Sequence, residues 1–297
     1  MTYTGELAGL ATAVCWTATA MSFQVASRRI GSVSVNLIRL VLAFLFYVAY
    51  TKIFMNQWLP FDAPLKAWIY LSISGVIGFV LGDFFLFKSY EFISSKISML
   101  IMTMAPPIAA LLGWFMMGEG FSWLNSLGMT LVILGVSIVI LKKDVENGIK
   151  KRRYPLKGIL FAFVGAVGQG VGAVFSKIGM GDYDPFAASQ IRVITGIAGF
   201  AIMITLMKRW KMVNAGIRNK QASKALLIGS FFGPFLGVSL GMVAFQHTSV
   251  GIASTLMATV PVFILLPSHL ILKEKLTLNE ALGALLAVAG IAVFFLH

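Results

Sequence analysis

Ten continuous apolar segments constrain the fold of this 297-residue chain more than any other feature. A helix needs about 20 apolar residues to cross a bilayer, and each segment is close to that length. They lie at 7–26, 34–54, 67–88, 97–117, 122–141, 156–176, 186–207, 225–246, 251–272 and 279–296. Backbone in lipid must satisfy its own hydrogen bonds, and uninterrupted apolar runs do not fit the alternating pattern of barrel strands. The sequence therefore predicts an all-α integral membrane protein with ten transmembrane helices.

Charged residues make up only 12% of the chain, whereas a soluble domain carries roughly 25%. This shortage excludes a lone soluble enzyme, a disordered chain and a collagen-like chain. The net charge of +13 would suggest a nucleic-acid partner if the protein were soluble. Because the basic residues gather in short connections between apolar segments, they indicate membrane topology instead. The lipid bilayer, and no nucleic acid, is the expected partner.

The two halves of the chain match each other at a nearly constant offset. Ser94–Leu141 aligns with Ser249–Leu296 at an offset of 155 residues. The less common matches are Pro106 with Pro261, Glu119 with Glu274, Gly128 with Gly283, and Gly135 with Gly290. An odd number of spans in each unit reverses the orientation of the second unit. The sequence thus predicts two inverted five-helix repeats, 1–141 and 156–297, joined by a basic cytoplasmic linker at 142–155, an arrangement typical of transporters.

The distribution of Lys and Arg predicts which side of each helix faces the cytoplasm. Connections after odd-numbered segments hold 19 of the 24 basic residues. Connections on the other side hold only Lys52, Lys66 and Lys177, and the remaining two residues lie inside segments. Positively charged loops stay in the cytoplasm. The odd-numbered connections are therefore expected there, with both termini outside, in a bacterial-type cytoplasmic (inner) membrane.

Three sequence motifs carry a family resemblance. The stretch Gly82-Asp83-Phe84-Phe85-Leu86-Phe87-Lys88, followed by Met104-Ala105-Pro106-Pro107 and Gly118-Glu119, resembles the EamA-type members of the drug/metabolite transporter superfamily. The second repeat follows the same plan, except that Lys273 replaces the turn glycine. The resemblance implies two inverted five-helix halves around a central cavity. Helices 1–4 and 6–9 would wall this cavity, with helices 5 and 10 at the periphery.

Three charged residues lie well away from the ends of the apolar segments, where a charge costs about 2.5–3.5 kcal/mol on insertion scales. They are Arg39, Asp83 and Arg192, and the two arginines align with each other at an offset of 153 residues. We expect Arg39 and Asp83 to pair in the cytoplasmic half of the cavity wall, either as a gate or as a static pair. Both arginines could instead extend to the headgroups. Asp83 is also the candidate for proton coupling.

The second repeat has Val238 where the first has Asp83. An acid equivalent to Asp83 is therefore missing from the second half of the predicted cavity. This difference would leave Arg192 free to attract an anionic group.

Other polar and kink-forming residues complete the candidate site. Direct solute contact and helix-to-helix hydrogen bonding both remain open for the polar side chains. The candidate solute-binding residues are Trp16, Gln24, Asn36, Arg39, Asp83, Ser98, Gln169, Gln190, Arg192 and Thr255. The candidate gating or hinge residues are Pro106, Pro261, Gly233 and Gly237. Prolines kink helices and small residues let helices approach closely, so static packing is the alternative for all four. Glycines in segments five and ten are expected to pack helices within a chain or between protomers, which allows a homodimer.

Catalytic and cofactor motifs are missing from the sequence. Its three histidines, His247, His269 and His297, are too scattered for a metal cluster, and there is no P-loop for ATP. We expect no enzyme activity, no cofactor and no metal. The predicted function is a secondary transporter that exports a small metabolite or drug-like solute by alternating access, with proton coupling as an option. Nutrient uptake or exchange on the same fold is the alternative, and an intramembrane lipid-modifying enzyme is a remote one.

Overall fold

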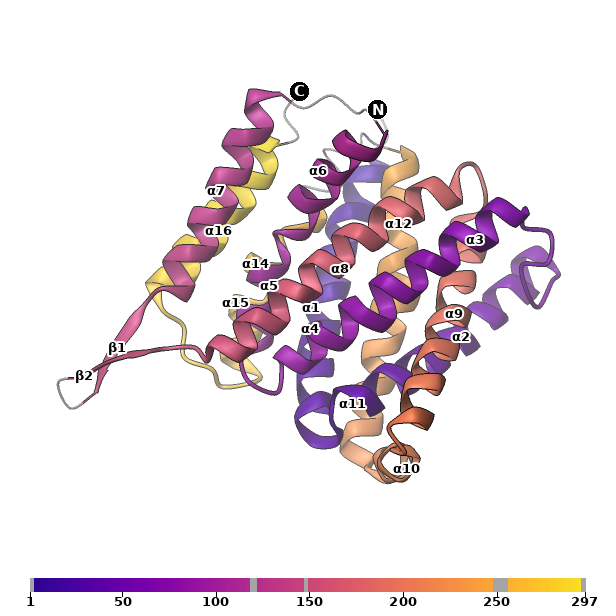
Figure 1. Cartoon of the computed structure of the whole chain (residues 1–297), viewed down its shortest axis with the longest axis horizontal. Coiled ribbons are helices and arrows are strands. Elements are labelled where there is room, and N and C mark those ends of the chain that lie inside the picture. Colours follow the sequence, from indigo (N-terminus) through magenta and orange to yellow (C-terminus); the bar gives the residue numbers. More distant parts are fainter. Residues whose placement is uncertain (1–2, 118–121, 147–148, 248–255, 295–297) are drawn as a thin grey trace.

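The structure, a computed structural model, describes residues 3–117, 122–146, 149–247 and 256–294 (Figure 1). The first half contains α1 (Thr4–Ile30), α2 (Ser32–Met55), α3 (Leu65–Ser74), η1 (Gly75–Asp83), α4 (Phe84–Ser89), α5 (Ser95–Met102), α6 (Ala105–Met117) and α7 (Trp123–Ile140). The second half contains α8 (Leu156–Met180), α9 (Pro185–Leu206), α10 (Trp210–Arg218), α11 (Lys220–Ser230), η2 (Phe231–Gly237), α12 (Val238–His247), α14 (Val260–Phe263), α15 (Leu265–Leu270) and α16 (Leu278–Phe294).

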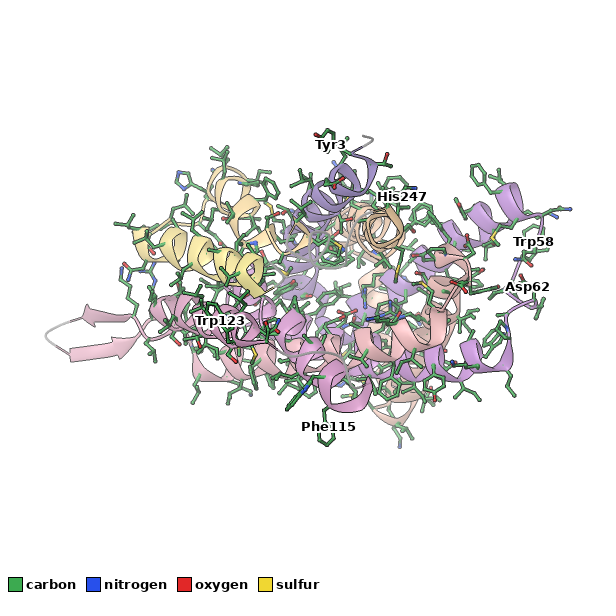
Figure 2. All side chains as sticks on the ribbon, turned by 90° about the horizontal axis from the view of Figure 1, so that it is seen from above. Tyr3, Trp58, Asp62, Phe115, Trp123 and His247 are labelled. Atoms are coloured by element: carbon green, nitrogen blue, oxygen red, sulfur yellow. The ribbon has the colours of Figure 1, made fainter. Side chains whose placement is uncertain are left out.

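Helix covers most of the described residues of all ten predicted segments, with internal turns at 103–104, 258–259 and 264. Seven helices are long and apolar enough to cross a membrane, and two shorter apolar helices cover 260–270 and 278–293. The seven lie at 32–55, 65–89, 95–115, 123–140, 156–180, 185–206 and 220–244. Helix α1 has 27 residues but is not among the seven. Large apolar side chains point outward, as a lipid-facing surface requires, and Phe115 is 84% exposed (Figure 2).

Eight helical segments form a closed ring in which the two repeats alternate. Around the ring, each packs on the next in the order α1, α11–α12, α2, α9, α3–α4, α8, α5–α6 and α14–α15, which returns to α1. Every ring neighbour therefore comes from the other half of the chain. These are the eight helices that the family resemblance places around a central cavity.

Helices α7 and α16 lie together outside the ring (Figure 1). They run antiparallel, because Gly135 lies against Gly283 whereas Gly290 lies against Gly128. Since Gly128 and Gly135 are the repeat equivalents of Gly283 and Gly290, each contact is the symmetry mate of the other. The bare backbones approach so closely that a Cβ at Gly135 would lie 2.6 Å from the Gly283 carbonyl oxygen. These glycines thus pack helices within one chain.

A second close approach joins the repeats inside the ring. Gly78 and Gly82 of η1 lie against Gly172 and Gly168 of α8. A Cβ at Gly168 would lie 2.7 Å from the Gly82 Cα, so the two helices touch backbone to backbone. Side-chain hydrogen bonds reinforce this contact, since Gln169 Nε2 donates to the Gly78 carbonyl at 3.1 Å and Ser74 Oγ to the Gly172 carbonyl at 2.6 Å.

Two elements outside the apolar segments were not predicted. The linker contains an antiparallel hairpin, β1 (Lys143–Glu146) and β2 (Ile149–Arg152), with Lys143 opposite Arg152. It projects away from the helices at the lower left of Figure 1. The connection after α9 contains α10, which buries Val213 and exposes Trp210. Both elements lie in basic connections that hydropathy alone describes only as polar.

Candidate functional site

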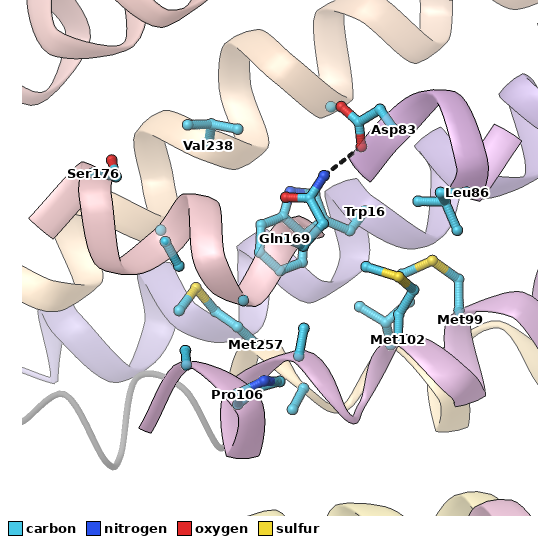
Figure 3. A pocket seen from close by; sticks show the side chains of 18 of the residues that line it. Trp16, Asp83, Leu86, Met99, Met102, Pro106, Gln169, Ser176, Val238 and Met257 are labelled. Atoms are coloured by element: carbon cyan, nitrogen blue, oxygen red, sulfur yellow. Dashed lines mark hydrogen bonds between the residues drawn. The ribbon is translucent and has the colours of Figure 1, made fainter. Parts of the chain in front are cut away.

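The ring encloses a cavity of about 620 Å³, within the range of about 300–1,000 Å³ typical of small-molecule sites. All eight ring segments contribute to its lining, which is mostly apolar and aromatic (Figure 3). The polar and charged lining residues are Thr19, Arg39, Asp83, Thr103, Gln169, Ser176, Lys177 and Arg192. A few polar groups placed in an apolar chamber suit a small organic molecule.

Helix breaks shape the cavity at equivalent positions of the two repeats. Helix α5 ends at Met102 and α6 begins at Ala105, directly before Pro106. In the second repeat a turn at 258–259 precedes α14, in which Pro261 occupies the first turn. Both prolines line the cavity. The predicted kinks are present, and a hinge motion at these breaks stays a prediction.

Two π-helical segments also occupy equivalent positions. Moved back by 155 residues, η2 (231–237) falls on 76–82, inside η1 (75–83). Widened turns of this kind are common at functional sites. Asp83 ends η1, and Gly233 of η2 lines the cavity. Gly237 lies against the Trp16 ring, so it serves close packing between η2 and α1 in this conformation.

The predicted pair of Arg39 and Asp83 is present and buried, with side chains only 4% and 9% exposed. Arg39 Nη2 donates to Asp83 Oδ2, and Gln169 Nε2 donates to the other carboxylate oxygen at 2.5 Å. Asn36 accepts a hydrogen bond from Arg39 Nε at 3.1 Å and donates to the Asp83 backbone carbonyl at 3.3 Å. Residues from α2, η1 and α8 therefore meet in one hydrogen-bonded group, which links the two repeats across the cavity wall.

Aromatic rings surround the Arg39 guanidinium. Its Cζ lies 4.8 Å from the centre of the Phe87 ring, 5.5 Å from Phe79 and 5.8 Å from Phe23. Ring faces attract a cation, and the attraction is stronger where water is excluded. The rings also keep water from the ion pair, so separating Arg39 from Asp83 requires another polar partner for each.

A second polar layer joins the ends of α1, α5, α8 and α16. Lys96 Nζ lies 2.9 Å from Glu280 and 3.9 Å from Glu274. Gln24 donates to Glu274 at 2.9 Å and accepts a hydrogen bond from the Ser95 backbone. This layer lies at the ring's basic end, where the odd-numbered connections meet. Its members do not line the cavity, whereas Arg39 and Asp83 do.

Tyr154 and Arg153, at the start of α8, extend this layer. Tyr154 donates to Glu280 at 2.5 Å, and Arg153 lies 3.7 Å from the same carboxylate. Burial and the hydrogen bond to Glu280 raise the pKa of the Tyr154 phenol. The phenol therefore remains a neutral donor throughout the physiological range. The linker between the repeats is thereby fixed to the end of the cavity.

Glu280→Gln is expected to lower the free energy of unfolding in detergent by about 1–3 kcal/mol, because Lys96 loses its nearest carboxylate while 94% of its side chain stays out of solvent. Thermal melting of the purified variant measures the loss. Glu91→Gln is the control, since it breaks the Lys88–Glu91 pair, whose side chains are 32% and 21% exposed. Such a pair contributes about 0–1 kcal/mol. Equal melting temperatures for the two variants would contradict a stabilising role for the layer.

The remaining predicted residues divide between the cavity and helix packing. Trp16, Gln169 and Arg192 line the cavity. Four others do not, because their side chains serve neighbouring backbone or side chains: these are Gln24, Asn36, Ser98 and Gln190. Ser98 pairs with the Ser89 hydroxyl at 2.7 Å, and Gln190 donates to the Trp58 carbonyl at 2.9 Å. Thr255 lies outside the described residues.

Comparisons with known proteins point to one family. The model of the EamA-like transporter family matches residues 3–141 and 156–296, the two repeats in turn. An uncharacterized transporter of Archaeoglobus fulgidus is 29% identical over 113 residues, and the match spans only 37% of each chain. A solved crystal structure resembles 97% of this chain and 94% of its own, with a TM-score of 0.64 and 16% identity, and so shares the fold.

Proposed function

The chain belongs to the EamA-like transporter family, and from this membership we propose that it is a secondary transporter of a small metabolite or drug-like solute. In this proposal ten helices cross the cytoplasmic membrane as two inverted repeats, with the odd-numbered connections inside and both termini outside. The single observation that carries the proposal is the 620 Å³ cavity enclosed by a ring of alternating repeats. A cavity between two inverted repeats can open first to one side of the membrane and then to the other.

The position of the polar layers supports a cycle of alternating access. The cavity reaches Met180 at the end of α8 and Gly113 near the end of α6. At the opposite, basic end, the Lys96 layer and the Arg39–Asp83 pair close the ring. In the proposed cycle this conformation is closed toward the cytoplasm. Opening it would separate Arg39 from Asp83, with bending at the breaks before Pro106 and Pro261.

The proposed direction is export, which follows the usual direction in the family. Asp83 would carry the coupled proton in a proton-driven cycle, since it is the one carboxylate among the described lining residues. Arg39 and Gln169 stabilise its ionised form while the pair is closed. Separation from both partners would let the carboxyl take up a proton.

Proteoliposomes test the proposal directly. Vesicles that contain purified protein are loaded with a cell metabolite extract, and the solutes released are identified by mass spectrometry. We expect saturable release of one solute or a few related solutes, and none from protein-free vesicles of the same lipid. Conversion of a lipid or solute to a new product, with no release, would favour an enzyme and contradict transport.

A further inference from the structure

Among the residues that the structure describes, one charged side chain of the cavity has neither a hydrogen-bond nor an ion-pair partner. Arg192, on α9, is 7% exposed and lines the cavity. Within the described ranges no carboxylate lies within ion-pair distance of its guanidinium, and its buried Nε donates to no acceptor. Arg39 on α2, the aligned arginine, has Asp83, Asn36 and three aromatic rings around it. The two arginines of the repeats thus differ in whether the chain itself supplies an anion.

Val238 explains the difference. It occupies the position of the second repeat that Asp83 occupies in the first, and it also lines the cavity. The second repeat therefore keeps the cation and lacks the acid, on a surface that faces the chamber. An arginine inside a membrane protein is costly and marks a functional site unless it is paired. The missing anion has to come from outside the chain, and the cavity is where it can enter.

The surroundings of Arg192 hold its guanidinium in place and leave its N–H groups available to an acceptor. The Arg192 Cζ lies 4.6 Å from the centre of the Phe79 ring. Arg192 Nη2 is 3.4 Å from the point where a Cβ on Gly78 would lie, and Gln169 Oε1 is 3.9 Å from the same point. The bare backbone of Gly78 thus lets the guanidinium and the amide converge beside the Arg39–Asp83 pair. A guanidinium oriented by an aromatic ring binds a planar anion with two parallel hydrogen bonds.

Ser176 is a second unpartnered group in the same lining. It lies on α8, is 4% exposed, and its hydroxyl has no hydrogen-bond partner. The rest of the lining is mostly apolar and aromatic. Lys177, the remaining cation of the lining, interacts with another residue of the chain. The cavity consequently offers one guanidinium with no ion-pair partner among the described residues, a neutral donor and an apolar chamber.

We propose that the transported solute is an organic anion whose carboxylate binds Arg192 and whose apolar body fills the aromatic chamber, with the Ser176 hydroxyl as a further donor. The proposal rests on the transport function proposed above and specifies its substrate class. The alternative is that Arg192 only packs α9 against η1 through Phe79. In that case neutralising Arg192 would change stability without changing the preference among ligands.

Three probes with the same body and different charge test this proposal: 3-phenylpropanoate, 3-phenylpropanamide and 3-phenylpropylamine. Binding to purified protein in nanodiscs is measured by calorimetry. We expect the carboxylate to bind more tightly than the amide and the amine. Arg192→Gln is expected to weaken carboxylate binding roughly 10- to 100-fold, the value of a hydrogen bond to a charged group, with little change for the amide. Arg218→Gln, at an exposed arginine of α10, is the matched control.

A second pair of variants covers the case in which Arg192→Gln fails to fold. Val238→Asp restores the acid of the first repeat, and we expect it to exclude the carboxylate probe, whereas Val238→Asn retains binding. Equal affinity for carboxylate and amide in the unmodified protein, or unchanged discrimination in Arg192→Gln or Val238→Asp, would overturn the anion site. Release of only neutral or cationic metabolites from the loaded vesicles would also overturn it and leave transport intact. Carboxylate binding without release of any solute would instead count against transport.

Discussion

Asp83→Asn is expected to reduce solute flux per folded molecule at least about 100-fold, because the proposed cycle opens and closes the Arg39–Asp83 pair. The same change should lower stability, since removing one partner of a buried ion pair costs roughly 3–5 kcal/mol. The variant leaves Arg39 charged among Phe23, Phe79 and Phe87, where little water can replace the carboxylate. Arg39→Gln leaves the opposite charge unpaired and should have a similar effect. Flux into proteoliposomes, normalised to monodisperse protein on size-exclusion chromatography, gives the measurement.

The double variant Arg39→Gln/Asp83→Asn separates a gate from a static pair. Removing both charges removes the cost of an unpaired ion, so thermal stability should recover in part. If the pair opens and closes during transport, flux stays low although the protein is stable. Recovery of flux together with stability would show that the pair is static. Lys88→Gln/Glu91→Gln neutralises a partly exposed ion pair and should leave flux unchanged.

Gly135→Val is expected to lower the free energy of unfolding by about 1–3 kcal/mol or more. A Cβ at Gly135 would lie 2.6 Å from the Gly283 oxygen and 2.7 Å from the Ala287 nitrogen. Both are backbone atoms of α16 and cannot rotate away, so α7 and α16 would have to separate. Because this helix pair lies outside the ring, molecules that remain folded should transport normally. Thermal melting and flux, measured on the same sample, separate the two effects.

Gly241→Ala is the control for this substitution. The nearest atom to a Cβ there is the thioether sulfur of Met257 at 3.1 Å, and the next lies 3.7 Å away. A methionine side chain adapts to an added methyl group at little cost. Wild-type melting of Gly135→Val would show that the α7–α16 contact does not limit stability.

Hydropathy and duplication could predict the helices and the pairing of Arg39 with Asp83. Apolar segments of membrane length have few alternatives in lipid, and two opposite charges at a similar depth have a strong reason to pair. The glycines of segments five and ten also indicated close packing, and the structure shows that this packing lies within one chain. The helices and the charge pair follow from length and depth in the membrane, and the glycine packing follows from spacing along a helix. All three can be read along the sequence.

Which way a side chain faces could not be predicted in the same way. Gln24 and Asn36 lie on ring helices, but a hydrophobic environment on all sides hides which face of a helix meets the cavity. The π-helical η1 contains no proline, so its widened turn has no clear sign in the sequence. The layer formed by Lys96, Glu274 and Glu280 joins residues up to 184 positions apart. Only the folded arrangement of the helix ends brings these charges together.

The alternation of the two halves around the ring has a consequence for biosynthesis. When the four ring helices of the first half leave the ribosome, the helices that flank each of them in the finished ring have not yet been made. Helix α8 packs against α3, α4, α5 and α6, so its insertion completes contacts that the nascent N-terminal half cannot make by itself. The N-terminal half therefore reaches its full set of ring contacts only after the second half has been inserted.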